Sequence, residues 1–307
     1  MTWRWVNLGA AAATFAFLVW RLGAGPFLDG LRTVDGGALA AASALAVLTT
    51  VCCAWRWRIV ARGLGVELPL GTAVAAYYRS LFLNVTLPGG VAGDVHRGWS
   101  HGRDTSDVGR GLRAVAWERS AGQLVQVVLT LVVLLFLPSP VRAIVPFACV
   151  ALIAAVAAVA LAARMRPATG ASRWARWRSA AARELRDGRV AWRAWPAIAL
   201  ASALVVAGHA ATFLIAARSA GATAPLSQML PLALLAMQAA ALPNVGGWGP
   251  REGATAWAFA AAGLGASVGV ATAVVYGVMV LVASLPGALV LLAGLGMPAR
   301  WEQALDA

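Results

Sequence analysis

The sequence predicts an all-α, polytopic membrane protein with about six spanning helices and two re-entrant helical hairpins in an inverted repeat. Three observations support this fold class. The 307-residue chain is 61% hydrophobic and only 12% charged, whereas a soluble domain is about twice as charged. Several runs approach the roughly 20 apolar residues that cross a bilayer. Two further apolar runs each end at a Leu-Pro pair followed by a glycine-rich, charged segment.

Six apolar runs are long enough to span the bilayer as helices. They are Trp5–Leu22, Ala38–Arg62, Gly111–Leu137, Val141–Arg164, Ala194–Arg218 and Ala266–Leu295. The first run lacks a convincing signal-peptide cleavage site, so we expect it to be retained. The other two apolar runs, Leu70–Leu87 and Leu226–Leu242, each precede a stretch too short to cross alone. This pattern is typical of re-entrant hairpins, whose broken backbone is tolerated only where protein or a water-filled cavity satisfies it.

All the basic charge comes from arginine, because the sequence contains no lysine, and the net charge is +13. Without lysine the chain has neither a Walker A ATP-binding loop nor a lysine Schiff base. The arginines gather between apolar runs, as membrane topology places them. We therefore expect no nucleic-acid partner.

The connection from Arg164 to Arg193 holds nine arginines and marks the cytoplasmic side by the positive-inside rule. Counting spans outward from it places both termini in the cytoplasm at a bacterial inner membrane. It also places Arg56 and its neighbours Arg58 and Arg62 on the cytoplasmic side. Tryptophans alternate with arginines over residues 165–193, which favours a helix lying in the headgroup layer. The alternative is a docking surface for a partner.

We expect one transmembrane domain over residues 1–307, with a first half near 38–137 and a second near 194–297. Each half contains a stretch that begins at a proline, Pro69 or Pro225, and runs through apolar residues to a Leu-Pro and a charged glycine-rich turn. The expected topology gives the two halves opposite orientations. Inverted repeats whose broken helices meet near mid-membrane point to the site of an alternating-access transporter.

Ionisable groups at membrane depth are costly and indicate functional sites. The candidate substrate-binding residues are Asn84, Asp94, Arg97, Glu118, Arg119, Arg251 and Glu252. We expect Arg97 and Arg251 to bind a headgroup phosphate, because the planar guanidinium donates two parallel hydrogen bonds. The carboxylates would orient these arginines or take up protons. The alternative is that the same residues form internal ion pairs that hold the hairpins together.

Prolines and glycines at the ends of the two hairpins are expected to form the cavity. They are Pro88, Gly89, Gly90, Gly93, Pro243, Gly246, Gly247 and Gly249. Proline breaks a helix, and glycine-rich turns let backbone N–H groups approach an anion. A helix that restarts after such a turn offers its positive end.

We expect no enzyme activity, metal or cofactor. The sequence has no G-x-S-x-G, H-E-x-x-H or Asp-rich prenyl-diphosphate motif. His96 and His101 lie near Asp94 and Asp104 at irregular spacing beside a cytoplasmic loop, so we expect solvated side chains there and no metal site. His209 is alone in an apolar span, where we expect a hydrogen bond to a neighbouring helix.

At these residues the sequence resembles the transmembrane, flippase-like region of lysylphosphatidylglycerol synthases. The first family signature is an Asn, a Leu-Pro-Gly and a Gly-Gly-Asp followed by Arg, matched by Asn84, Leu87, Pro88, Gly89, Gly93, Asp94 and Arg97. Ala92 replaces one glycine. A Glu-Arg in the next helix is matched by Glu118 and Arg119. The second signature is a proline, a Gly-Gly-x-Gly and an Arg-Glu, matched by Pro243, Gly246, Gly247, Gly249, Arg251 and Glu252. The late Tyr-Arg of the family is Tyr276-Gly277 here.

The resemblance spans roughly Ala38 to Leu295 and implies translocation of a lipid between leaflets. The chain ends at Ala307, without room for the synthase's catalytic domain, so we expect a stand-alone member. Its cargo would be a phospholipid, glycolipid or polyprenyl-linked lipid, and its protein partner a lipid-synthesising enzyme. Two other functions stay open: an integral membrane enzyme acting on a lipid-linked phosphate, and a non-transporting accessory protein of a lipid-modifying enzyme.

Overall fold

The structure is a computed structural model that describes residues 34–87, 89–164, 194–242, 244 and 248–296. Within these ranges the chain forms nine α-helices and no strand, so the predicted all-α class is confirmed. The predicted first span, Trp5–Leu22, and the basic segment 165–193 lie outside the described residues. So do four of the predicted helix breaks, namely Pro88, Pro243, Gly246 and Gly247.

Four helices in the described part of the chain are long and apolar enough to cross a membrane: α3 (Gly36–Gly63), α6 (Val108–Phe136), α9 (Trp195–Ser219) and α12 (Ala266–Gly296). Even α9, with 25 residues, rises about 37 Å at 1.5 Å per residue, more than the hydrocarbon core of about 30 Å. These helices correspond closely to four of the predicted spans. The chain is therefore a multi-pass membrane protein.

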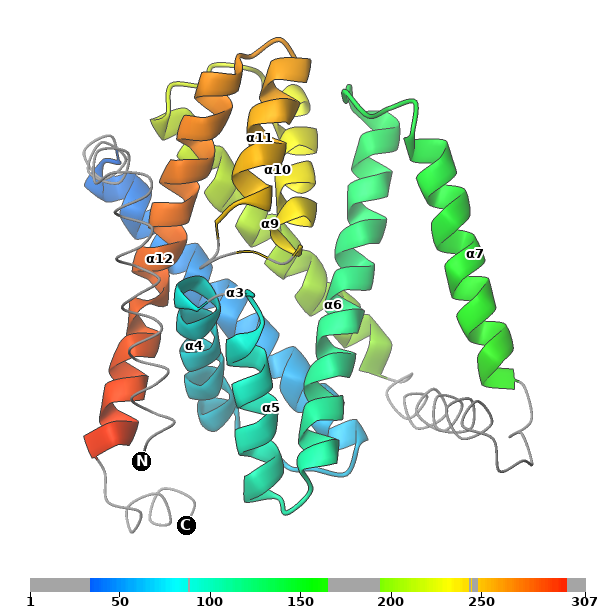
Figure 1. Ribbon diagram of the computed structural model, residues 1–307, viewed down its shortest axis with the longest axis vertical. Coiled ribbons are helices and arrows are strands. Elements are labelled where there is room, and N and C mark those ends of the chain that lie inside the picture. The colour runs from blue at the N-terminus through cyan, green and yellow to red at the C-terminus, as the bar shows by residue number, and fades with distance from the viewer. Residues whose placement is uncertain (1–33, 88, 165–193, 243, 245–247, 297–307) are drawn as a thin grey trace.

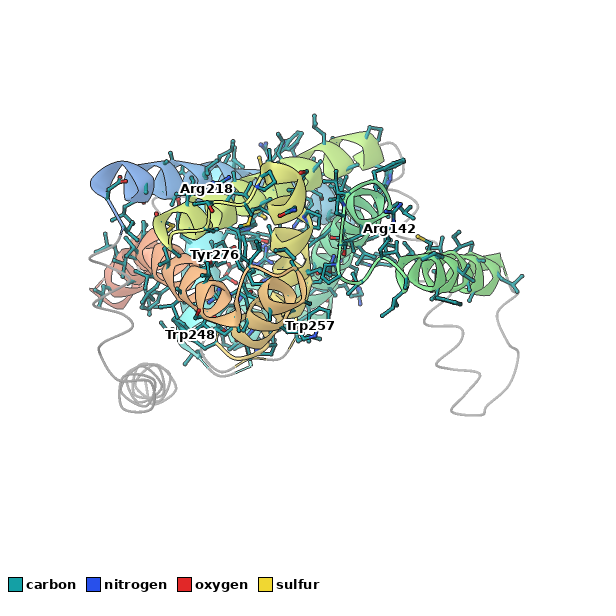
Figure 2. The ribbon with its side chains drawn as sticks, turned by 90° about the horizontal axis from the view of Figure 1, so that it is seen from above. Arg142, Arg218, Trp248, Trp257 and Tyr276 are labelled. Carbon is teal, nitrogen blue, oxygen red and sulfur yellow. The ribbon has the colours of Figure 1, made fainter. Side chains whose placement is uncertain are left out.

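The predicted span Val141–Arg164 corresponds to α7 (Val145–Arg164). The helix begins later than predicted because Pro138 and Pro140 are followed by a turn that continues to Ile144. Both views show α7 standing apart from the other helices, connected to the end of α6 (Figures 1 and 2). Most of its large apolar side chains, from Phe147 to Leu161, are exposed, which suits a helix surrounded by lipid.

Two helical hairpins complete the bundle. The first consists of α4 (Leu70–Thr86) and α5 (Ala92–Asp104), and the second of α10 (Leu226–Ala240) and α11 (Pro250–Ala261). Their helices have 17, 13, 15 and 12 residues, fewer than the roughly 20 that cross a bilayer. The hairpins occupy opposite ends of the bundle, and their broken ends face each other in the middle (Figure 1).

The broken ends of the hairpins touch. The backbone N–H of Gly89, which follows the first break, donates a hydrogen bond of 2.7 Å to the carbonyl oxygen of Asn244, which follows the second. Gly89 has a φ of +95°, a conformation that glycine adopts without steric cost. An N–H and a carbonyl that the two breaks leave without helical partners thus satisfy each other.

Glycines allow the first hairpin to pack closely. A Cβ atom at Gly93 of α5 would lie 2.1 Å from the carbonyl oxygen of Ser80 in α4. A Cβ atom at Gly287 of α12 would lie 2.1 Å from the carbonyl oxygen of Tyr78, also in α4. Backbone-to-backbone packing of this kind is common where small residues meet in membrane helices. It fixes α4 between α5 and α12.

Two large apolar clusters lie at the two ends of the bundle. One packs around the first hairpin and includes Ala54, Trp57, Leu68, Tyr77 and Val115. Another packs around the second hairpin and includes Phe213, Met229, Leu232, Phe259 and Met279. A smaller cluster joins α9 to α10 through Val206, Ala210, Leu234 and Met237. The buried charged residues, Asp94, Arg97, Arg251, Arg56 and Glu118, lie on the hairpin helices that follow the breaks and on the neighbouring helices α3 and α6.

Candidate functional site

Glu118 is the centre of a buried ionic network. Its carboxylate, on α6, is fully buried and accepts hydrogen bonds from Arg56 Nε at 2.9 Å and Arg97 Nη2 at 3.0 Å. The Tyr77 hydroxyl donates to it at 3.2 Å. Arg56 also donates to the Ser202 hydroxyl at 2.8 Å. The network joins α3, α4, α5, α6 and α9, and it compensates a carboxylate that would be costly to bury alone.

Arg97 is enclosed by this network. Its guanidinium lies between the rings of Trp57 and Tyr77, 4.4 Å and 4.2 Å from their centroids, where cation–π attraction stabilises a desolvated cation. Its Nη2 atom donates to both Asp94 and Glu118. Because only 1% of Arg97 is exposed, this arginine is placed inside the protein as the bridge between two carboxylates.

Asp94 lies in the first turn of α5, next to the first break. Its carboxylate accepts hydrogen bonds from Ser80 Oγ at 3.2 Å and Asn84 Nδ2 at 3.0 Å, and it forms an ion pair with Arg119 of α6. Asn84 Oδ1 accepts the backbone N–H of Gly93 at 2.8 Å. Side chains of α4 therefore satisfy the start of α5 and fix the geometry of the break.

The Asp94 carboxyl is held in its ionised form. Burial alone would raise its pKa, but the guanidinium groups of Arg119 and Arg97 outweigh burial and hold the pKa below its usual value. Asp94 is therefore a permanent counterion for these arginines at neutral pH.

The second hairpin carries its own ion pair at the start of α11. Arg251 donates to Glu252 Oε1 from Nε at 2.9 Å and from Nη2 at 2.5 Å. Glu252 Oε2 accepts the backbone N–H of Gly249 at 2.6 Å, which satisfies one of the free donors at the helix start. The guanidinium of Arg251 also lies 5.6 Å and 5.1 Å from the rings of Trp248 and Tyr276. Its orientation is thus fixed from several sides.

Gly277 makes room for this arginine. A Cβ atom there would lie 2.7 Å from Arg251 Nη2 and 2.9 Å from the Trp248 ring. The family has Tyr-Arg where this chain has Tyr276-Gly277, and the structure shows what occupies the space of the missing arginine. In this chain the space beside Tyr276 is filled by the guanidinium of Arg251.

A cavity of about 260 Å³ lies at the broken ends of the hairpins, and we call it the chamber. Its walls come from both hairpins and from α6, α9 and α12. They consist of Leu81, Asn84, Val85, Gly90, Arg119, Gln123, Gln126, His209, Met237, Ala240, Ala241, Asn244, Arg251, Tyr276 and Val280. The wall thus presents guanidinium and amide groups, whose N–H groups are suited to hydrogen bonding with an anion.

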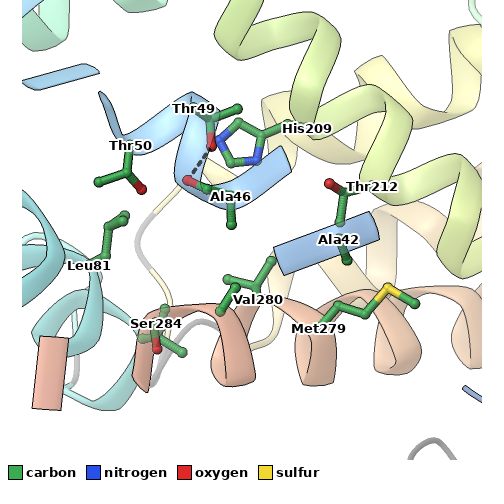
Figure 3. A pocket seen from close by; sticks show the side chains of 12 residues that line it. Ala42, Ala46, Thr49, Thr50, Leu81, His209, Thr212, Met279, Val280 and Ser284 are labelled. Atoms are coloured by element: carbon green, nitrogen blue, oxygen red, sulfur yellow. Dashed lines mark hydrogen bonds between the residues drawn. The ribbon is translucent and has the colours of Figure 1, made fainter. Parts of the chain in front are cut away.

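A smaller pocket of about 50 Å³ adjoins the chamber (Figure 3). Four residues line both spaces, namely Leu81, Val85, His209 and Val280. The Nδ1 atom of His209 and the Tyr276 hydroxyl are hydrogen-bonded at 3.3 Å. The predicted hydrogen bond from His209 to a neighbouring helix is therefore confirmed.

The structure brings five predicted site residues into one network: Asn84, Asp94, Arg97, Glu118 and Arg119. The other two, Arg251 and Glu252, form the pair on the second hairpin. Three of the seven line the chamber, namely Asn84, Arg119 and Arg251. Of the predicted breaks within the described residues, Gly90 lines the chamber, and Gly89, Gly93 and Gly249 shape its neighbourhood.

One side chain was placed wrongly from the sequence, and the role of another was not predicted. Arg56 was expected on the cytoplasmic side with no part in the site, and its guanidinium is buried against Glu118. His101 was expected to be solvated, but it is buried and packs edge-on against Trp57, with 5.3 Å between ring centroids. The signal for Arg56 was its position inside an apolar run. The aromatic partners Trp57 and Tyr77 had no signal in the sequence.

Comparison with known proteins identifies the family. Residues 4–287 match a family model described as the lysylphosphatidylglycerol synthase TM region. No curated protein and no solved structure matches the chain. The match covers most of the 307 residues and includes both hairpins and the chamber. The chain therefore belongs to the family of the lysylphosphatidylglycerol synthase transmembrane region, which confirms the resemblance seen in its two signatures.

Proposed function

We propose that this protein moves a phospholipid or glycolipid between leaflets by passing the headgroup through the chamber. The observation that carries the proposal is the meeting of two arginines, Arg119 and Arg251, in one cavity at the broken ends of the two hairpins. A phosphate is a fitting ligand, because each guanidinium donates paired hydrogen bonds and keeps its charge. The acyl chains would remain in the lipid outside.

The two arginines, Arg119 and Arg251, differ in their exposure and in how firmly their side chains are oriented. The Arg119 side chain is 47% exposed while its Nη2 atom pairs with Asp94, so its other N–H groups are available to a headgroup. Arg251 is mostly buried and is oriented by Glu252, Trp248 and Tyr276. Prior orientation by carboxylates and rings reduces the entropy lost when a phosphate binds. In this proposal Arg119 takes the phosphate contact predicted for Arg97, and Arg97 holds Asp94 in place.

The proposed mechanism is alternating access in an inverted repeat. Residues near 38–137 and 194–297 would form the two halves, and the hairpins would open the chamber to one leaflet at a time. The described elements fit this order, because α3 and α6 flank the first hairpin as α9 and α12 flank the second. With Trp5–Leu22 and α7 as further spans, both termini and the basic segment 165–193 would face the cytoplasm of a bacterial inner membrane.

The proposal is tested with purified protein in liposomes that contain a phospholipid labelled on its acyl chain. Dithionite, which does not cross the membrane, bleaches label in the outer leaflet. We expect the protein to make the inner-leaflet label accessible, whereas protein-free liposomes protect about half of it. Mass spectrometry of the same lipid checks the enzyme alternative. A converted headgroup without lipid movement would contradict the proposal.

A further inference from the structure

The charge of the chamber wall has one sign. Among the chamber residues that the structure describes, the charged ones are Arg119 and Arg251, and none is an aspartate or glutamate. Burial in a membrane protein strengthens such a field, because the surroundings screen it weakly. The wall therefore attracts a negative group and repels a positive one.

The nearby carboxylates are occupied by the protein itself. Both oxygens of Asp94 accept hydrogen bonds from protein side chains, including those of Asn84 and Arg119. Glu118 is fully buried between Arg56 and Arg97. An ammonium group entering the chamber would find no described carboxylate on its wall to pair with.

Both oxygens of Glu252 are used in the same way at the start of α11. They accept the N–H of Gly249 and the guanidinium of Arg251. The second hairpin therefore presents the cation of its ion pair to the chamber and keeps the anion outside the wall.

The uncharged polar groups of the wall suit hydroxyl groups. Gln123 donates to Gln238 at 2.9 Å, and Gln238 donates to the Thr130 hydroxyl at 2.8 Å, which fixes the Gln123 amide. Gln126 also lines the chamber, and its amide has no protein partner among the described residues. An amide both donates and accepts hydrogen bonds, as does a hydroxyl, whereas an ammonium group only donates. These amides match a polyol better than an amine.

We infer that the chamber selects a lipid headgroup with a phosphodiester and hydroxyl groups but no amine, and disfavours an aminoacylated, cationic headgroup. The inference rests on the proposed function and narrows its substrate. Phosphatidylglycerol and an inositol- or sugar-bearing phospholipid share this chemistry. The specificity comes from repulsion of the wrong headgroup as well as from attraction of the right one.

The test compares four lipids with identical labelled acyl chains in the liposome assay: phosphatidylglycerol, phosphatidylinositol, phosphatidylethanolamine and lysylphosphatidylglycerol. We expect the two amine-free lipids to move on the order of tenfold faster than the two amine-bearing ones, because like charges meet in the chamber. The faster of the two amine-free lipids distinguishes a glycerol from a sugar-like headgroup.

A charge variant tests whether the chamber causes the preference. Gln126→Glu adds a carboxylate to the wall and should raise the rate of lysylphosphatidylglycerol relative to phosphatidylglycerol. Gln228→Glu is the matched control, because Gln228 is exposed near the start of α10 and does not line the chamber. It should leave the ratio of the two rates unchanged.

The outcomes separate the two ideas. If the wild-type protein moves none of the four lipids, the proposed function itself fails. If it moves all four equally, or the lysylated lipid fastest, the proposed function stands and the headgroup inference is overturned. An unchanged ratio of the lysylphosphatidylglycerol rate to the phosphatidylglycerol rate in folded Gln126→Glu protein would also overturn the inference. The comparison of the four lipids with the wild-type protein does not depend on the folding of any variant.

Discussion

The backbone N–H of Gly89 donates a hydrogen bond of 2.7 Å to the carbonyl oxygen of Asn244. This bond joins the broken ends of two hairpins that come from opposite ends of the bundle (Figure 1). Asn244 also lines the chamber, together with Gly90. The two breaks therefore form one structural unit, and a change in one of them should alter the wall built by the other.

Gly90→Ala should disturb this unit. Gly90 has a φ of +67°, and a Cβ atom there would lie 2.5 Å from the Asn244 side chain. The left-handed backbone alone costs about 1–2 kcal/mol for an L-residue. We expect a lower free energy of unfolding and slower lipid movement, measured by thermal unfolding and the liposome assay. Gly71→Ala is the control, because a Cβ atom at Gly71 meets nothing within 4 Å. Equal stability of the two variants would contradict the packing at the hairpin ends.

Glu118→Gln should be severely destabilising. The variant leaves Arg56 buried without its carboxylate partner and leaves Arg97 with Asp94 alone. Removing one partner of a buried ion pair costs about 3–5 kcal/mol. Thermal unfolding of the purified protein measures the effect.

The control for Glu118→Gln is an ion pair at the surface. Asp107→Asn acts on the pair of Asp107 and Arg110, whose side chains are 37% and 42% exposed. Exposed pairs contribute about 0–1 kcal/mol, so this variant should unfold close to the wild-type temperature. If the two variants lose similar stability, Glu118 is not the centre of a buried network.

Asp94→Asn should show a defined dependence on pH. Because its neighbours lower the pKa of Asp94 in the fold, the carboxylate stabilises the protein above its unfolded pKa of about 3.9. That stabilisation is lost as the pH falls through the lower, folded-state pKa. The difference in unfolding temperature between wild type and variant should thus be constant from about pH 8 to pH 5 and shrink below about pH 4. A difference that disappears between pH 7 and pH 5 would mean that Asp94 takes up a proton in that range.

The helices and their breaks were predictable because their signals are local. Run length separated the spanning helices from the hairpins, since α4 and α11 are simply too short to cross. The Leu-Pro-Gly at residues 87–89 marked a break, because proline cannot continue the hydrogen-bonding pattern of a helix. The charged pairs at the breaks, such as Asp94 with Arg97, were also predicted, because they stand in the sequence directly after the residues that mark each break.

The partners within the site depend on tertiary packing and were not predictable. Arg56 and Arg58 are two residues apart in the same stretch, and only the packing of α3 against α6 turns Arg56 towards Glu118. Gly122 makes this possible, since a Cβ atom there would lie 2.7 Å from Arg56 Nη1. Likewise, the choice of Arg119 over Arg97 as a chamber residue follows from the rings of Trp57 and Tyr77 that enclose Arg97. One sequence does not reveal such distant contacts.

The central claim, that Arg119 and Arg251 guide a headgroup through the chamber, is tested most directly by the liposome assay on Arg119→Ala and Arg251→Ala. Arg142→Ala is the matched control, because Arg142 is exposed at the connection between α6 and α7 (Figure 2). Loss of a charge-assisted hydrogen bond of about 1.5–3 kcal/mol predicts roughly 10- to 100-fold slower lipid movement in each chamber variant. Arg142→Ala should move lipid at the wild-type rate. Wild-type rates in folded Arg119→Ala and Arg251→Ala protein would contradict the account.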